Sequence, residues 1–261
     1  MIRKYLQKIY LALIFILLYA PIVTLVVLSF NQSKTRAKWG GFTLKWYKEL
    51  FRNEQIMSAF YTTLIIAFIS AAIATLIGTA AAIAIQGMKQ KWKTMYMGLT
   101  NIPMMNADII TGVSLFLLFV SFGISQGFTT VVLAHITFCT PYVVLSVMPR
   151  LKKMNPNVYE AALDLGATPF QALRKVIFPE ILPGMISGFI LAFTLSIDDF
   201  AVTIFTIGNE GLETLSTYIY ADARKGGLTP ELRPLSTIIF VTVLVLLIVI
   251  NKRAERNKNS D

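Results

Sequence analysis

The sequence has little charge, a single cysteine and a single histidine. Charged residues make up 15% of its 261 residues and hydrophobic residues 55%, and the mean hydropathy is +0.64. This composition excludes a water-soluble domain and predicts an integral membrane protein. Cys139 alone provides neither a disulfide framework nor a thiolate cluster, and His135 with Cys139 offers too few ligands for a metal. We therefore expect no metal site and assign these two side chains to hydrogen bonds between helices.

The chain also lacks the short motifs that bind nucleotides or catalytic metals. It contains no G-x-x-x-x-G-K-[ST] phosphate loop, no H-E-x-x-H and no C-x-x-C. We therefore expect it not to be an enzyme and to need no cofactor, so that the energy for any active process comes from another protein. The net charge of +10 does not indicate nucleic-acid binding, because the basic residues lie between apolar runs, where they set topology and contact lipid headgroups.

Long apolar runs make up most of the sequence. Since about 20 apolar residues cross a bilayer, these runs predict an all-α protein with about six transmembrane helices. The predicted spans are residues 9–30, 58–85, 102–122, 128–148, 181–207 and 232–250. The first run is longer than a secretory signal and no small-residue cleavage site follows it, so we expect it to be retained. Small residues at four-residue spacing predict close packing of the second span: Ala74, Gly78 and Ala82.

These spans divide the chain into three parts. Residues 1–57 hold the first span and an outer loop with a short interfacial helix, residues 58–251 form the membrane domain, and residues 252–261 form a basic tail. An even number of spans places both termini on one side of the membrane. The distribution of Lys and Arg between the loops predicts that this side is the cytoplasm.

One polar loop, residues 150–180, interrupts the membrane domain. Asn155 is a predicted helix N-cap followed by Pro156, and Thr168 is a second N-cap that forms a capping box with Gln171. Gly166 breaks the chain between the two predicted helices. The loop is therefore expected to form two short helices that meet at a bend, a shape that fits the groove of a partner protein.

The spacing within this loop resembles the EAA loop of permease subunits of ABC importers. The pattern comprises Glu160-Ala161-Ala162, Gly166 and Val176-x-Phe178-Pro179. The family usually has Ile and Leu where this chain has Val176 and Phe178, and both replacements keep an apolar residue. The resemblance implies a MetI-like permease fold and a cytoplasmic coupling loop. It further implies that Glu160, Ala161, Ala162 and Gly166 meet a separate ATP-hydrolysing subunit.

Other stretches extend the resemblance over nearly the whole chain, to the C-type permease subunit of spermidine/putrescine importers. They are residues 193–200, 135–139, 104–109 and 41–43, with Trp46-Tyr47. The resemblance implies ATP-driven polyamine import across the cell (inner) membrane. It also implies the partners: a second related permease, two copies of an ATPase, and an extracytoplasmic binding protein that delivers the polyamine.

Acidic residues inside the predicted spans are candidates for the substrate path, because ionisable groups are costly in a membrane. Asp108, Asp198 and Asp199 would suit a cation and would disfavour sulfate or phosphate. If the fifth span is one continuous helix, Asp198 and Asp199 point about 100° apart. Asp199 then shares a small-to-polar stripe that includes Ser196 and Thr203, so we expect Asp199 to meet the substrate first, with Asp108 second and Asp198 more structural. The alternative for each carboxylate is pairing with a basic residue of a neighbouring helix or subunit.

Three other functions also fit parts of the sequence. An ABC permease for iron or an anion would share the EAA-like loop. An ion-coupled secondary transporter would explain six spans and intramembrane carboxylates, but it would not need a polar two-helix docking loop. A structural membrane subunit would retain its function after neutralisation of all three carboxylates.

Overall fold

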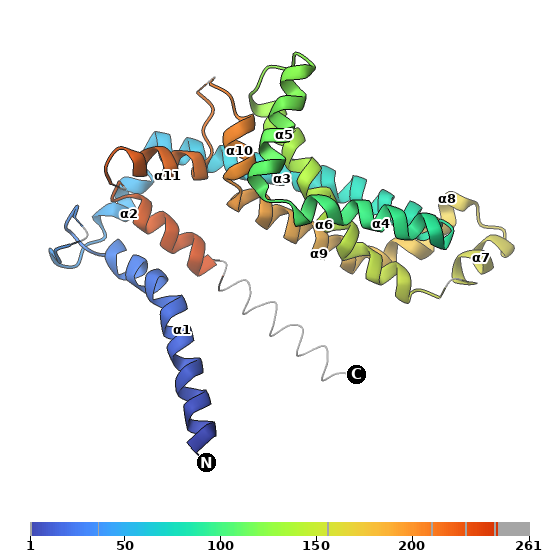
Figure 1. Cartoon of the computed structure of the whole chain (residues 1–261), viewed down its shortest axis with the longest axis horizontal. Helices are drawn as coiled ribbons and strands as arrows, with labels where there is room; N and C mark the ends of the chain where they lie inside the picture. Colours follow the sequence, from blue (N-terminus) through green and yellow to red (C-terminus); the bar gives the residue numbers. More distant parts are fainter. Residues whose placement is uncertain are drawn as a thin grey trace. The chain divides into compact units, whose positions relative to one another are not determined.

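A computed structural model describes residues 2–35, 37–155, 157–209, 211–227, 229–242 and 244, and shows an all-α protein. Within these residues the only strand-like pairing is one isolated antiparallel bridge between Asn31 and Phe42. The chain forms two compact units: residues 59–218 make one, and the segments before and after them make the other. Figure 1 shows the helices of both units.

The unit that contains the chain ends begins with the apolar helix α1, Ile2–Ser29, and includes a short helix, α2, Lys45–Leu50. The loop between them is organised by the buried side chain of Asn31, whose Oδ1 accepts the Gly40 amide at 2.8 Å. Trp46 Nε1 donates a hydrogen bond to the Asn31 carbonyl at 2.8 Å, and this bond holds α2 against the loop. The short helix expected in this loop is confirmed.

A second contact in the same unit ties the last described helix, Leu232–Thr242, to this loop. The buried Arg233 guanidinium donates to the carbonyls of Ser33 and Lys34, the first at 3.2 Å. Residues 243–250 of the predicted sixth span, apart from Leu244, and the predicted tail 252–261 lie outside the described residues.

The other unit is built around α6, Phe128–Lys153, between α3, Glu54–Gln86, and α9, Phe178–Asp198 (Figure 1). Small residues set the distances between these helices, as is usual in membranes. A Cβ added at Gly78 would lie 2.8 Å from the Val143 side chain, and one at Gly188 would lie 3.2 Å from it. Ala74 and Ala82 are fully buried, so the predicted packing face of the second span is confirmed.

The predicted third span, 102–122, is wrong at its start. The helix α4 already begins at Gln90 and runs to Met105, α5 runs from Asp108 to Ser121, and the two axes bend by 103°. Asn106 and Ala107 are extended, with ψ of 149° and 139°, and this interrupts the i to i−4 hydrogen bonding. Much of the segment 86–101, which lies between the second and third predicted spans, is therefore helical.

The predicted fifth span, 181–207, is also not one helix. It continues a helical stretch that starts at α8, Pro169–Ala172, and passes through a π-helical turn, η1, Leu173–Ile177. α9 then ends at Asp198, Asp199 is extended with ψ of 130°, and a new short helix, α10, spans Ala201–Thr206. The break therefore separates Asp198 from Asp199, so the two carboxylates do not belong to one continuous helix.

Four described helices are long and apolar enough to cross a membrane, and the bent pair α4 and α5 would add a fifth. They are α1, α3, α6 and the helical stretch that ends with α9. The segment 208–231, which lies between the fifth and sixth predicted spans, contains an additional helix, α11, Leu215–Arg224.

Candidate functional site

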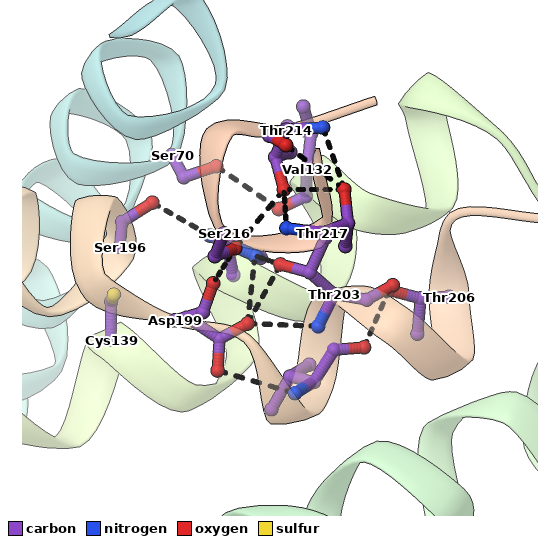
Figure 2. A network of polar contacts seen from close by, with 12 residues as sticks. Ser70, Val132, Cys139, Ser196, Asp199, Thr203, Thr206, Thr214, Ser216 and Thr217 are labelled. Carbon is purple, nitrogen blue, oxygen red and sulfur yellow. Dashed lines mark hydrogen bonds and ion pairs between the residues drawn. The ribbon is translucent and has the colours of Figure 1, made fainter. Parts of the chain in front are cut away.

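The side chain of Asp199 is the centre of a buried polar cluster at the break between α9 and α10 (Figure 2). Its Oδ1 accepts the Val202 amide at 3.2 Å, and its Oδ2 accepts the Thr203 amide at 2.8 Å and the Thr203 hydroxyl at 2.7 Å. The extended backbone at Asp199 turns the carboxylate toward these donors. Asp199 therefore caps α10, and its side chain is only 6% exposed.

His135 joins this cluster from the central helix α6. Its Nδ1 lies 2.6 Å from Ser196 Oγ, and its Nε2 lies 3.0 Å from Thr203 Oγ1 and 3.5 Å from Asp199 Oδ2. The residue is 1% exposed, and its ring lies against Phe138 with 5.1 Å between ring centres. One imidazole thus contacts the residues before the break and the residues after it.

Further hydroxyl groups hold the backbone around the break (Figure 2). Ser216 Oγ donates to the Asp199 carbonyl at 2.7 Å, and Thr130 Oγ1 donates to the Thr206 carbonyl at 2.8 Å. Cys139 Sγ donates to the Ala192 carbonyl at 3.4 Å. The expected hydrogen bonds between helices are therefore confirmed for both His135 and Cys139.

The structure separates the five predicted path residues into two groups. Ser196, Asp199 and Thr203 come together in the buried cluster, whereas Asp108 and Asp198 are exposed. Each exposed carboxylate lies beside a helix break: Asp108 is the first residue of α5, and Asp198 is the last residue of α9. Neither carboxylate forms a hydrogen bond or ion pair with another described side chain.

The two breaks lie next to each other. Gly112, one turn after Asp108, packs so closely on the start of α10 that an added Cβ would lie 2.9 Å from the Ala201 carbonyl oxygen. Ala201 is only three residues after Asp198. The exposed carboxylates are therefore presented by adjoining helix ends, an arrangement typical of ion and substrate sites in broken transmembrane helices.

A second candidate site is the polar loop, which forms the two predicted short helices. α7 spans Asn157–Asp164, Gly166 adopts a φ of +86°, and Thr168 begins α8. The predicted capping box is confirmed, because Thr168 Oγ1 accepts the Gln171 amide at 3.3 Å and the Thr168 amide donates to Gln171 Oε1 at 3.0 Å.

The start of α7 also fits its predicted cap. The Asn157 amide donates to Asn155 Oδ1 at 3.0 Å, while Pro156 lies outside the described residues. The coupling-loop residues Glu160 and Ala161 are exposed and Ala162 is half-buried. At the bend, Leu165 is 89% exposed. The loop thus presents an apolar tip on a defined, capped backbone.

Sequence reasoning missed the roles of His135, Ser216 and Thr130 around Asp199. His135 was expected to form hydrogen bonds between helices, but nothing in the sequence paired it with Asp199, because the helix break was not predicted. Among the described residues, no group of three or more His, Cys, Asp or Glu side chains is arranged to hold a metal ion.

Residues 74–252 match the model of a family described as the binding-protein-dependent transport system inner membrane component. The chain belongs to this family. The permease is 41% identical over 248 residues to the spermidine/putrescine transport system permease protein PotC of Escherichia coli (strain K12), covering 95% of this chain and 93% of that protein.

Two further similarities support the assignment of family and fold. The permease is 37% identical over 257 residues to the putrescine transport system permease protein PotI of the same strain, covering 95% of this chain and 91% of that protein. It also resembles a chain of a bacterial ABC transporter that imports the acidic polysaccharide alginate, with a TM-score of 0.71, 19% identity, and coverage of 97% and 96%. The permease is a multi-pass membrane protein with an ABC importer permease fold.

Proposed function

We propose that this permease is a transmembrane subunit of an ATP-driven importer for polyamines. The observation that carries the proposal is the 41% identity to a spermidine/putrescine permease across 95% of the chain. Fold alone does not select the substrate, because the alginate transporter shares the architecture at 19% identity. The exposed carboxylates give independent chemical support, since they suit a substrate with several ammonium groups and disfavour an anion.

The proposed substrate path passes the two adjoining helix breaks. Asp198 and Asp108, which are exposed, make the first contact with the ammonium groups, and Asp199 contributes its negative charge from behind them. This order differs from the one expected for a continuous helix, in which Asp199 came first. The new order follows from the hydrogen bonds at Asp199, because three donors already occupy its carboxylate oxygens. Ser196 and Thr203 belong to the same buried cluster and are not exposed to a substrate.

The energy for transport comes from a partner subunit in this proposal. The loop with Glu160, Ala161, Ala162 and Gly166 faces the cytoplasm and docks into an ATPase that is present in two copies. A second related permease completes the path, and an extracytoplasmic binding protein delivers the polyamine. Both termini of the permease then lie in the cytoplasm. The exposed apolar tip and the bend at Gly166 support a docking role for the loop.

Uptake in cells that lack their own polyamine importers tests the proposal. The permease is expressed with its neighbouring subunits and binding protein, and uptake of labelled spermidine and putrescine is measured. We expect saturable uptake that requires the binding protein, is inhibited by vanadate, and is unaffected by excess sulfate or iron. Uptake of iron or an anion in place of polyamines would support the alternative ABC permease. Uptake that is insensitive to vanadate and independent of the binding protein would support a secondary transporter.

A further inference from the structure

The imidazole of His135 is the one described side chain of α6 that hydrogen-bonds to side chains on both sides of the α9–α10 break. Ser196 lies before the break and Thr203 after it. Because α6 is the central helix of its unit, these contacts attach a discontinuous helix to the most buried part of the fold. The position of the break is therefore set by residues on another helix.

The donors between His135 and Asp199 can be identified from the acceptor at the end of the chain, the Asp199 carboxylate. A carboxylate accepts hydrogen bonds, and the Thr203 hydroxyl donates one to Asp199 Oδ2. Thr203 Oγ1 is then the acceptor for a proton on His135 Nε2. The other ring nitrogen, Nδ1, is hydrogen-bonded to Ser196 Oγ at 2.6 Å. Ser196, His135, Thr203 and Asp199 thus form one continuous hydrogen-bonded chain that ends at the Asp199 carboxylate.

This chain of hydrogen bonds fixes the geometry of the break. Ser196, His135, Thr203 and Asp199 are linked in sequence, so that the end of α9 and the start of α10 are fixed relative to α6. Asp198 is the last residue of α9 and is exposed immediately beside these buried groups. Any rotation of the break would move Asp198 and leave Ser196 and Thr203 without their shared partner.

We propose that His135 is a positioning residue, which holds the break between α9 and α10 so that Asp198 is presented toward the substrate path. The inference rests on the proposed function in one respect, namely that the surface to which Asp198 is exposed is the substrate path. The hydrogen-bonded arrangement itself does not depend on which substrate is carried. His135 acts through Ser196, Thr203 and Asp199, and it does not touch the substrate.

Two variants separate a hydrogen-bonding role from simple space filling. His135→Phe keeps a ring but removes both polar contacts, whereas His135→Gln keeps a side chain that can both donate and accept hydrogen bonds. A matched control is available on the same helix. Thr137 is exposed and its hydroxyl donates only to the carbonyl of Leu133, at 2.8 Å, so Thr137→Val removes a hydroxyl without touching the break.

The position of residue 198 is measured directly, without transport. In a Cys139→Ser background, Asp198→Cys is introduced into the assembled transporter in membranes, and the rate of modification by a cationic thiol reagent is recorded. We expect His135→Phe to change this rate by roughly tenfold, the factor that loss of one or two net hydrogen bonds produces. His135→Gln should restore a rate near that of the parent, and Thr137→Val should leave it unchanged.

Uptake kinetics in the background with native Asp198 provide the second measurement. We expect His135→Phe to raise the half-saturating spermidine concentration more than it lowers the maximal rate, with rescue by His135→Gln. Unchanged modification of residue 198 in His135→Phe would overturn the proposal, as would equal effects of His135→Phe and His135→Gln, because packing alone would then explain the residue. If the parent transporter takes up no polyamine, the proposed function fails, while the modification rates still decide the role of His135.

Discussion

At the scale of single residues, two adjacent carboxylates have different surroundings. Asp199 is 6% exposed and accepts three hydrogen bonds, two of them from the first amides of α10. Asp198 is exposed and forms no such bonds within the described residues. A buried charge of this kind persists in a membrane because its donors offset an insertion cost of about 2.5–3.5 kcal/mol.

The difference predicts separate effects of neutralising each carboxylate. Asp199→Asn places an amide NH₂ group against the Val202 and Thr203 donors, so it should destabilise the permease by about 1 kcal/mol, as for loss of a helix cap, and reduce uptake. Asp198→Asn should leave stability unchanged and raise the half-saturating spermidine concentration. Thermal unfolding in detergent, followed beside uptake at matched membrane levels, measures both. Wild-type stability of Asp199→Asn would contradict the capping role.

At the scale of helices, close packing at Gly112 holds the two breaks together. An added Cβ there would meet the Ala201 carbonyl at 2.9 Å and the Phe205 ring at 3.0 Å, and backbone cannot yield cheaply. Gly112→Ala is therefore expected to destabilise the permease by about 1–3 kcal/mol, in the range of overpacked cores. Gly98→Ala is the matched control, because an added Cβ at that helical glycine meets nothing within 4 Å. Equal unfolding temperatures for the two variants would show that the breaks do not depend on this contact.

The bend in the coupling loop depends on backbone conformation alone. Gly166 has a φ of +86°, and a Cβ added there would meet no atom within 4 Å, so a substitution is strained but not crowded. We expect uptake to fall in the order Asn, Ala, Val at this position, because Asn tolerates the left-handed region best and β-branched Val least. Membrane levels and the ATPase response to the binding protein are measured alongside. Full uptake by Gly166→Val would refute the role of the bend in coupling.

The first, second and fourth spans, the packing face of α3 and the capped loop could be predicted from the sequence, because hydropathy, small-residue spacing and capping patterns are local signals. The breaks at Asn106 and Asp199 could not. Residues 181–207 carry no charged residue apart from the paired carboxylates, and both a continuous and a broken helix fit that pattern. What selects the break is a set of bonds from distant residues, notably His135, Ser216 and Thr130.

At the scale of the whole molecule, orientation in the membrane is the next prediction. Single cysteines at Lys91 and Asn157 should be protected from an impermeant thiol reagent in intact cells, and those at Lys38 and Glu213 should react. Each is placed in a Cys139→Ser background, in which the buried native thiol is removed. Labelling at position 157 without permeabilisation would invert the topology and move the coupling loop away from a cytoplasmic ATPase.

The central claim is that this chain forms the path of an ATP-driven polyamine importer, and transport by the purified complex tests it most directly. Proteoliposomes containing both permeases and the ATPase are supplied with binding protein, labelled spermidine and ATP on the appropriate sides. We predict spermidine accumulation that requires ATP hydrolysis and falls when Asp198 and Asp108 are both changed to Asn. Accumulation that is unaffected by these changes would contradict the proposed path, and ATP hydrolysis without any movement of spermidine or putrescine would contradict the account as a whole.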